Sequence, residues 1–432
     1  MKKNSLINSS WLIIEKVISM LGLFLVSAFV ARYIGPSMVG QIALAIACFQ
    51  IVIVVAQFGS ENIIIKRLSK KRLSGIKLAK TSLILRVIIY ILCAAGILLY
   101  VRSDNYVEFV FFCAVGIASF FTAIDVVATY NDTNLNSKRN AILNLFGLII
   151  SLAMRYIIVY MQLNPLLLTL PIITTTLIPF MMRVYFYYMK DEERTKNIRQ
   201  EKYLQHFKYL IMTGSAMFIA NISVAIYPRV NIFFLSELSG SHELGIYSVA
   251  VTLATSWNFI MLAFVTSCFP SIYNEENENL AAIKTTQLNV IIAVISTVVI
   301  VGFIIFGSYI IKTLYGPAFT TAWRPAVILC AGTMLSAMGA VSSRYIVKFS
   351  GYRYLSYKSF IALLLCMPVS YFLIKNHGIT GAACSVVALE FLSLTVLNYG
   401  YKNGTVFKMH RLTLTFIPAL LSHLWQQRQG KA

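Results

Sequence analysis

Three arginines, Arg86, Arg155 and Arg229, lie within long apolar stretches of this 432-residue chain. An ionisable side chain inside a membrane costs about 2.5–3.5 kcal/mol on insertion scales and usually faces a protein interior or a cavity. The guanidinium group suits phosphate, because its planar fork donates two parallel hydrogen bonds and keeps its charge. The three arginines therefore predict an anion-binding cavity between helices, although each side chain alone is long enough to reach the membrane surface.

The acids expected within apolar stretches are Glu15, Asp125 and Glu390. Carboxyl groups at such depth relay protons or pair with cations in many transporters. We therefore interpret these three residues as candidates for coupling transport to H⁺ or Na⁺, and we expect no other cofactor.

Uncharged polar residues recur at helical spacing beside these charges. At 100° per residue, Asn144, Ser151 and Arg155 share one face of a helix. Pro228 directly precedes Arg229 and should bend or break its helix, because proline lacks the backbone donor. Such a face either lines a cavity or contacts a neighbouring helix, and the sequence leaves both open. The polar residues expected in the cavity are Gln50, Gln57, Asn144, Ser151, Asn221 and Asn231.

Long apolar helices must position these residues, because 58% of the chain is hydrophobic and only 12% is charged. A soluble domain carries about 25% charged residues, so the composition indicates an all-α protein that crosses a membrane many times. A span needs about 20 mainly apolar residues. About twelve candidates follow, at residues 9–34, 41–59, 78–101, 107–129, 140–161, 165–188, 209–235, 245–268, 285–311, 324–345, 358–374 and 379–400.

The net charge of +21 arises from 37 Lys and Arg against 16 Asp and Glu. A nucleic-acid-binding protein would gather this charge on one solvated face, whereas here it lies between apolar stretches. With the N-terminus in the cytoplasm, about 26 cations fall on the cytoplasmic side and about 5 on the other. The cytoplasmic group includes the cations within residues 66–80, 138–139, 190–208 and 348–358, and Lys284. This bias predicts two cytoplasmic termini and loops that contact membrane lipids, and it disfavours nucleic acid as a partner.

The spans divide into two groups of six. We expect residues 1–208 to form one six-helix lobe with a cytoplasmic linker, and residues 209–402 to form the other. Residues 403–432 should form a basic tail in the cytoplasm or at the membrane surface. A weak repeat relates the lobes, because three small residues recur after 205 positions: Gly35, Gly40 and Ala45 match Gly240, Gly245 and Ala250.

Residues for covalent or metal catalysis are scarce. The five His fall in predicted loops or in the tail, and no HExxH motif, GxSxG motif or Gly-rich phosphate loop occurs. The seven Cys lie in apolar stretches without a CxxC pair, which disfavours a disulfide framework or a zinc site. The predicted outer connections are also short, so we do not expect an enzyme.

Four stretches carry a resemblance to a known family: residues 31–36 (ARYIGP), 226–231 (IYPRVN), 244–250 (LGIYSVA) and 314–319 (LYGPAF). With the twelve-helix plan they resemble the Wzx-type O-antigen flippases of the multidrug/oligosaccharidyl-lipid/polysaccharide exporter superfamily. In many relatives an acid follows the arginine of helix seven within two residues. Here Val230 and Asn231 stand there, so no coupling role is carried over from that acid.

The resemblance implies a V-shaped pair of lobes with a cationic central cavity in the bacterial inner membrane. It implies alternating-access transfer of an undecaprenyl-pyrophosphate-linked oligosaccharide from the cytoplasmic to the periplasmic leaflet. An O-antigen polymerase and a chain-length regulator would then be partners. On this interpretation Arg86 meets the pyrophosphate first, and Arg155 and Arg229 hold anionic groups nearer the outer side.

Two other functions are compatible with the sequence. The first is a small-molecule or drug antiporter of the same superfamily, which the excess of arginine over acid within the spans disfavours for a cationic substrate. The second is a membrane glycan polymerase, which the short outer loops and the lack of a predicted buried His disfavour.

Overall fold

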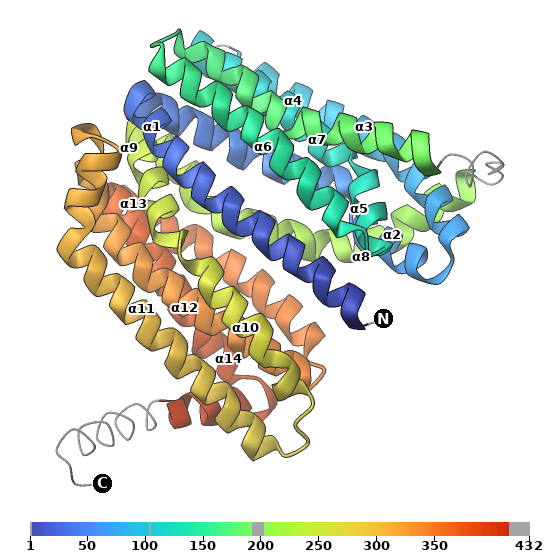
Figure 1. Ribbon diagram of the computed structural model, residues 1–432. Coiled ribbons are helices and arrows are strands. Elements are labelled where there is room, and N and C mark those ends of the chain that lie inside the picture. Colours follow the sequence, from blue (N-terminus) through green and yellow to red (C-terminus); the bar gives the residue numbers. More distant parts are fainter. Residues whose placement is uncertain (1, 103–104, 192–202, 414–432) are drawn as a thin grey trace. The chain divides into compact units, whose positions relative to one another are not determined.

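The computed structural model describes residues 2–102, 105–191 and 203–413, and the regular structure of these ranges is entirely helical (Figure 1). Side chains are described from residue 22 onward, except at 190–191, 203–204, 216–217, 219–220 and 403. The chain divides into two compact units, unit 1 (Met1–Ser236) and unit 2 (Glu237–Ala432). The predicted lobe boundary at 208/209 stays a prediction, and each unit is described by itself.

Unit 1 consists of long helices with short helical segments between them. Its elements are α1 (Lys2–Gln57), α2 (Ser60–Lys70), α3 (Arg72–Val101), α4 (Tyr106–Ile124), α5 (Val126–Thr133), α6 (Ser137–Tyr160), η1 (Pro165–Leu168), α7 (Thr169–Asp191), α8 (Tyr203–Ile226) and η3 (Tyr227–Arg229). Helix α1 packs against α3, α4 and α6, and α6 packs against α7.

Unit 2 begins within α9 (Val230–Thr255), which crosses the boundary between the units. It continues through α10 (Asn258–Tyr273), α11 (Glu278–Leu314), η4 (Pro317–Ala322), α12 (Trp323–Lys348), α13 (Tyr352–Leu394), α14 (Val396–Tyr399) and η5 (Lys402–Gly404). Residues 405–413 form a further helix. Within unit 2, α12 packs against both α11 and α13.

Nine stretches of the described chain are long and apolar enough to span a membrane. Three of them contain a glycine with non-helical backbone angles: Gly35, Gly240 and Gly378. Dividing those three stretches at glycine turns nine stretches into twelve segments. The all-helical membrane fold is thus confirmed, while twelve bilayer crossings and two cytoplasmic termini stay predictions.

The sequence repeat corresponds to a repeated turn. Gly35 has φ 78° and ψ 172°, and Gly240 has φ 82° and ψ 174°. This backbone region is open essentially only to glycine. An added Cβ would meet no other atom within 4 Å at either position, so the requirement for glycine comes from the backbone alone. Ten residues further on, Ala45 and Ala250 are both fully buried (0% exposed), so the packing that follows the turn is also repeated.

The helix over the predicted span 41–59 ends at Gln57, two residues before the predicted bound. Helix α1 ends at Gln57, because Phe58 (φ 45°) and Gly59 (φ 67°) adopt left-handed angles before α2 begins. Gln57, which was expected in the cavity, is therefore the last residue of α1, and Glu61 lies beyond the break on α2.

The predicted span 107–129 is interrupted as well. Asp125, with ψ 73°, separates α4 from α5. Its Oδ1 accepts a hydrogen bond from the backbone N–H of Ala128 at 3.0 Å and so caps the start of α5. An isolated acid in an apolar stretch was interpreted as an ion site, but here it also marks a helix boundary.

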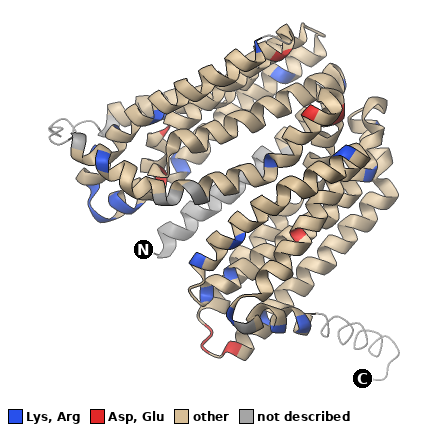
Figure 2. Ribbon diagram, turned by 180° about the vertical axis from the view of Figure 1, so that it is seen from behind, with Lys and Arg blue, Asp and Glu red and all other residues tan. Residues whose placement is uncertain are grey.

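The segments predicted to be cytoplasmic gather at one end of unit 1, which we call its inner end. The guanidinium carbon of Arg67 on α2 lies 4.9 Å from the ring centre of Tyr209 on α8. That of Arg139 at the start of α6 lies 5.8 Å from the ring centre of Phe186 near the end of α7. Figure 2 shows most Lys and Arg residues near helix ends.

Two of the apolar clusters of unit 1, which we call its outer and inner cores, follow one another along the unit, and a further cluster contains Val30, Phe111, Ile158 and Leu168. The outer core contains Phe49, Tyr90 and Phe112 from α1, α3 and α4. The inner core contains residues of α2, the first turns of α3, α5 and the start of α8: Ile63, Ile64, Leu68, Ile76, Leu78, Ala79, Val126, Tyr130 and Leu210. The buried charges of unit 1 are found on the helices that pass between these two cores.

Candidate functional site

Arg86 on α3 is almost completely buried, with 1% of its surface exposed. Its Nε and Nη2 donate to Oγ of Ser60 at 3.1 and 2.9 Å, and its Nη1 donates to the carbonyl of Ala123 at 3.1 Å. Ala123 stands at the end of α4, where a continuing helix would have supplied an N–H donor. All three guanidinium nitrogens thus have protein acceptors, and contact with an anion stays a prediction that requires Arg86 to leave them.

Asp125 forms a buried ion pair with Arg183 of α7. Nε and Nη2 of Arg183 lie 2.7 and 2.5 Å from Oδ2 of Asp125, and both side chains are less than a tenth exposed. Nη1 of Arg183 donates to Oδ1 of Asn144 on α6 at 2.7 Å. The structure therefore joins two predicted residues, Asp125 and Asn144, through an arginine that the sequence did not single out.

Arg229 and Gln50 are brought together although 179 residues separate them. Nε and Nη2 of Arg229 donate to Oε1 of Gln50 at 2.9 and 2.5 Å, and Nη1 donates to the carbonyl of Ala225. The break predicted at Pro228 is present as η3, which separates α8 from α9. Arg229 is half-buried, so part of its guanidinium surface stays open.

Arg155 lies on α6, one turn after Ser151. Its Nε is buried and has no hydrogen-bond partner among the described residues. Ser151 itself is fully engaged, because its Oγ donates to the carbonyl of Pro171 at 2.8 Å and accepts from Thr175 at 2.7 Å. The polar face of α6 thus combines a helix contact at Ser151 with an available donor at Arg155.

The remaining predicted residues are more dispersed. Asn231 on α9 is buried, and Asn221 on α8 and Gln57 on α1 are half-buried. Glu390 is half-buried on α13 in unit 2. The side chain of Glu15 lies outside the described part of the structure, so its proposed role stays a prediction.

Unit 2 contains a cluster of buried polar side chains that the sequence did not suggest. Lys358 was expected at the cytoplasmic edge of its span, but α13 begins at Tyr352 and buries it (8% exposed). Its Nζ donates to Oδ1 of Asn398 at 2.8 Å, and Asn398 is fully buried. The carboxylate of Glu390 acts electrostatically on Lys358, so this candidate acid has a nearby cation.

His410 was expected in an exposed tail, but it is buried against the ends of two helices of unit 2 (7% exposed). Its Nε2 lies 3.0 Å from Oγ of Ser342, and its Nδ1 lies 3.3 Å from the hydroxyl of Tyr399. Burial, together with the charge of Lys358, lowers the pKa of His410 to about 4. The imidazole is therefore neutral near pH 7.

The helix of residues 405–413 is attached to unit 2 through a single apolar face. Val406 and Met409 are fully buried in the same core as Trp257, and Thr286 donates to the Met409 carbonyl at 3.3 Å. Buried positions three and four residues apart are the spacing of one helix face. This part of the predicted tail is thus docked, while residues 414–432 lie outside the described residues.

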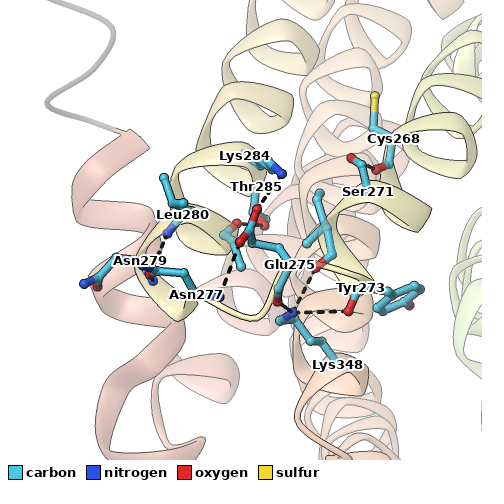
Figure 3. A network of polar contacts seen from close by, with 12 residues as sticks. Cys268, Ser271, Tyr273, Glu275, Asn277, Asn279, Leu280, Lys284, Thr285 and Lys348 are labelled. Atoms are coloured by element: carbon cyan, nitrogen blue, oxygen red, sulfur yellow. Dashed lines mark hydrogen bonds and ion pairs between the residues drawn. The ribbon is translucent and has the colours of Figure 1, made fainter.

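A further polar network lies at the connection between α10 and α11 (Figure 3). Nζ of Lys348 donates to the carbonyls of Ile272 and Glu275 at 2.9 and 2.5 Å, near the end of α10. The Glu275 carboxylate pairs with Lys284 at 2.7 Å, and this hydrogen bond lowers its pKa. Lys348 and Lys284, both predicted to be cytoplasmic, lie together here, which defines the inner end of unit 2.

The arrangement separates the cations within the membrane-spanning stretches into two kinds. Arg86 and Arg183 lie near acids, because Asp125 acts electrostatically on both and Glu61 acts on Arg86. Within the described part of the chain, no acid acts on Arg155 or Arg229. Those two arginines therefore carry charge that an anionic ligand could neutralise. The same part of the chain contains no group of three or more His, Cys, Asp or Glu that could hold a metal ion.

A family model described as "Polysaccharide biosynthesis protein" matches residues 29–327. No curated protein matches the chain significantly.

Two solved structures are similar to the chain over nearly their whole length. One is the inward-facing conformation of a multidrug resistance MATE family transporter of the MOP superfamily, with a TM-score of 0.70, 13% identity, and 91% of this chain and 99% of that chain covered. The other is the lipid II flippase MurJ in an inward closed conformation, with a TM-score of 0.69, 14% identity, and coverages of 94% and 92%. At these identities the similarity shows the fold, and it agrees with the fold implied by the sequence resemblance.

Proposed function

Because the chain belongs to the polysaccharide biosynthesis protein family, whose model matches residues 29–327, we propose that this membrane transporter is a flippase for a lipid-linked oligosaccharide. The family match is the observation that carries the proposal. The similarity of fold to the lipid II flippase MurJ supports it, since that protein is also a flippase.

The proposed substrate is an undecaprenyl-pyrophosphate-linked O-antigen repeat unit, moved by alternating access from the cytoplasmic to the periplasmic leaflet of the bacterial inner membrane. An O-antigen polymerase and a chain-length regulator would act on the product outside. The carrier itself forms and breaks no covalent bond in this scheme. It must instead offer the pyrophosphate and the sugars a path that avoids the apolar bilayer core, where charged groups are costly.

Arg155 and Arg229 are the residues best suited to hold the anionic head group. Arg229 donates to the neutral amide of Gln50, so its charge stays available, and a phosphate oxygen is a stronger acceptor than an amide oxygen. Arg155 offers a buried Nε without a partner among the described residues. Since no acid among the described residues acts on either arginine, the two positions favour an anionic substrate over a cationic drug.

Coupling to H⁺ or Na⁺ is assigned in this proposal to Asp125, with Glu390 and Glu15 as further candidates. Asp125 is the best supported of these, because protonation of its carboxylate would weaken the ion pair with Arg183 and change contacts among α4, α5 and α7.

The test is complementation of a strain that lacks this protein, with surface glycan as the measurement. We expect Arg155→Ala and Arg229→Ala each to lower surface glycan by about tenfold, the effect of losing one charge-assisted hydrogen bond. Arg229→Lys should retain part of the activity, because it keeps the charge but loses the planar fork. Arg324→Ala is the matched control, because Arg324 is exposed at the start of α12.

Two further measurements separate the alternatives. Single lipid-linked repeat units should accumulate on the inner leaflet of the deletion strain, whereas loss of a polymerase would leave single units on the outer leaflet. Sensitivity to cationic drugs should not change, whereas loss of a drug antiporter would raise it. If both alanine variants sustain full surface glycan at normal protein levels, the two arginines do not hold the substrate.

A further inference from the structure

Two short helices, α2 and α5, lie at the inner end of unit 1 with non-helical residues on both sides. Helix α2 follows Phe58 and Gly59 and ends at Lys70, and the next residue, Lys71, is extended with φ −142° and ψ 92°. Helix α5 follows Asp125 and precedes Leu135, which has φ 59°. In contrast, α3, α6 and α7 continue through the same region without a break. Among the described elements at this end, α2 and α5 are therefore short helices bounded by non-helical residues on both sides, which is where a rotation of the backbone can take place.

The two short helices pack against each other and share an apolar core. Ile63 and Ile64 of α2 are 4% and 0% exposed, and they belong to the same cluster as Val126 and Tyr130 of α5. This inner core is separate from the outer core that contains Phe112. The α2–α5 pair thus packs around one apolar cluster, and α3 and α8 supply the opposite side of that cluster through Ile76, Leu78, Ala79 and Leu210.

Arginine side chains tie this body to the long helices. Arg86 of α3 donates to Ser60, the first residue of α2, and to the carbonyl of Ala123, at the end of α4. Arg183 of α7 pairs with Asp125, the N-cap of α5. The contacts at the two breaks are therefore directional hydrogen bonds, which can be exchanged singly.

We propose that the α2–α5 pair is a lid on the inner end of unit 1, and that Arg86 is the positioning residue that holds it closed through Ser60 and the Ala123 carbonyl. Opening consists of a rotation at the breaks around Gly59 and Asp125 while α3, α6 and α7 keep their places. Its part in transport rests on the proposed function: the lid would open and close on the cytoplasmic side once in each transport cycle.

The first test measures lid opening directly and needs no transport. Ala79 faces the inner core from α3 and is 8% exposed, while Ala45 lies in the outer core and is 0% exposed. Each alanine is replaced by cysteine in a chain whose seven native cysteines are changed to serine or alanine, and the rate of maleimide labelling in membranes is measured. We expect Ser60→Ala to speed labelling of Ala79→Cys by about tenfold, because Arg86 loses one acceptor. Labelling of Ala45→Cys should not change.

Unchanged labelling of Ala79→Cys would overturn the lid. An equal increase at both positions would also overturn it, because that result would indicate general loosening of unit 1.

The second test locks the lid. Arg67→Cys with Tyr209→Cys, joined by a short bis-maleimide, ties α2 to α8, where the native side chains already touch. The matched control, Arg139→Cys with Phe186→Cys, ties the long helices α6 and α7, which the proposal leaves in place. In inside-out membrane vesicles we expect the first cross-link to abolish flipping of a lipid-linked oligosaccharide and the second to leave it unchanged.

The two proposals fail in different ways. Equal flipping with both cross-links would overturn the lid and leave the transport function intact. If the protein without cross-links moves no lipid-linked oligosaccharide, the proposed function fails, while the labelling rates still decide whether the lid opens.

Discussion

In unit 1 two buried charges, Arg183 and Asp125, form an ion pair at a helix break, whereas in unit 2 a cluster of buried polar side chains includes a lysine and a histidine. Arg183 meets the carboxylate of Asp125 directly. Lys358 and His410 instead make their hydrogen bonds to the neutral groups of Asn398, Ser342 and Tyr399. The first network fixes the interrupted helices of unit 1, and the second fixes the helix of residues 405–413 to unit 2.

The contrast is instructive because the two units share a turn. Gly35 and Gly240 have nearly the same backbone angles, yet the polar residues inside the units are of different kinds. The repeated feature is therefore backbone geometry, and the chemistry has been placed separately in each unit. Substitutions that remove one partner at a time should therefore lower the free energy of unfolding more at a paired charge than at a neutral contact.

The largest expected effect is at the ion pair of unit 1. Arg183→Leu leaves Asp125 buried without its cation and should lower the free energy of unfolding by about 3–5 kcal/mol. Lys358→Met in unit 2 leaves the neutral Asn398 without its donor and removes the cation near Glu390, and it should cost about 1–2 kcal/mol. The measurement is unfolding in detergent, by heat or by denaturant.

A double variant serves as the control. Asp125→Asn combined with Arg183→Leu removes the uncompensated charge and should recover part of the loss. A double variant less stable than Arg183→Leu alone would show that the Asp125 carboxylate contributes through another contact.

The next largest expected effect is a pH dependence of the free energy of unfolding that arises from His410 in unit 2. The folded state holds the pKa of His410 at about 4, below its ordinary 6.5, so the unfolded state binds a proton first as the pH falls. Above pH 6.5 the residue has no effect, and between pH 6.5 and 4 stability is lost by up to about 3 kcal/mol. His410→Gln should remove this loss. The measurement is the unfolding temperature of the unmodified protein and of His410→Gln, each at pH 7.5 and at pH 5. The difference between the two proteins should be smaller at pH 5 than at pH 7.5.

Gly35→Ala and Gly240→Ala test the shared turn. Each should cost about 1–3 kcal/mol, because alanine is strained at these angles even where space is free. Gly96→Ala is the control, since this position also offers space but lies within α3 without a positive φ, so alanine there should be neutral or stabilising. If the losses in free energy of unfolding at Gly35 and Gly240 are clearly unequal, the two turns contribute differently to stability despite their similar backbone angles.

The overall fold could be predicted from sequence, because a bilayer requires long apolar helices and their lengths can be counted. The repeated turn could be found because Gly35 and Gly240 stand 205 positions apart in similar surroundings. The partner of Asp125 could not be found, since Arg183 contacts it only after α4 and α7 pack together. Hydropathy also gave no sign that Phe58 would end α1, because a phenylalanine fits the middle of an apolar helix equally well.

The smallest effects are expected at the inner end of unit 2, where charges are partly solvated. Lys348 donates to carbonyls near the end of α10, so Lys348→Met should cost about 0.5–1 kcal/mol through the loss of this cap. Lys284→Met breaks only the ion pair with the partly exposed Glu275 carboxylate and should leave the unfolding temperature nearly unchanged. The two lysines have the same charge and lie in one network (Figure 3). The difference between the effects of the two substitutions on stability therefore depends on the group to which each lysine bonds. If Lys284→Met lowered stability more than Lys348→Met, a partly solvated ion pair would contribute more here than hydrogen bonds to the carbonyls of a helix end. The contrast between the two units could then no longer be attributed to burial.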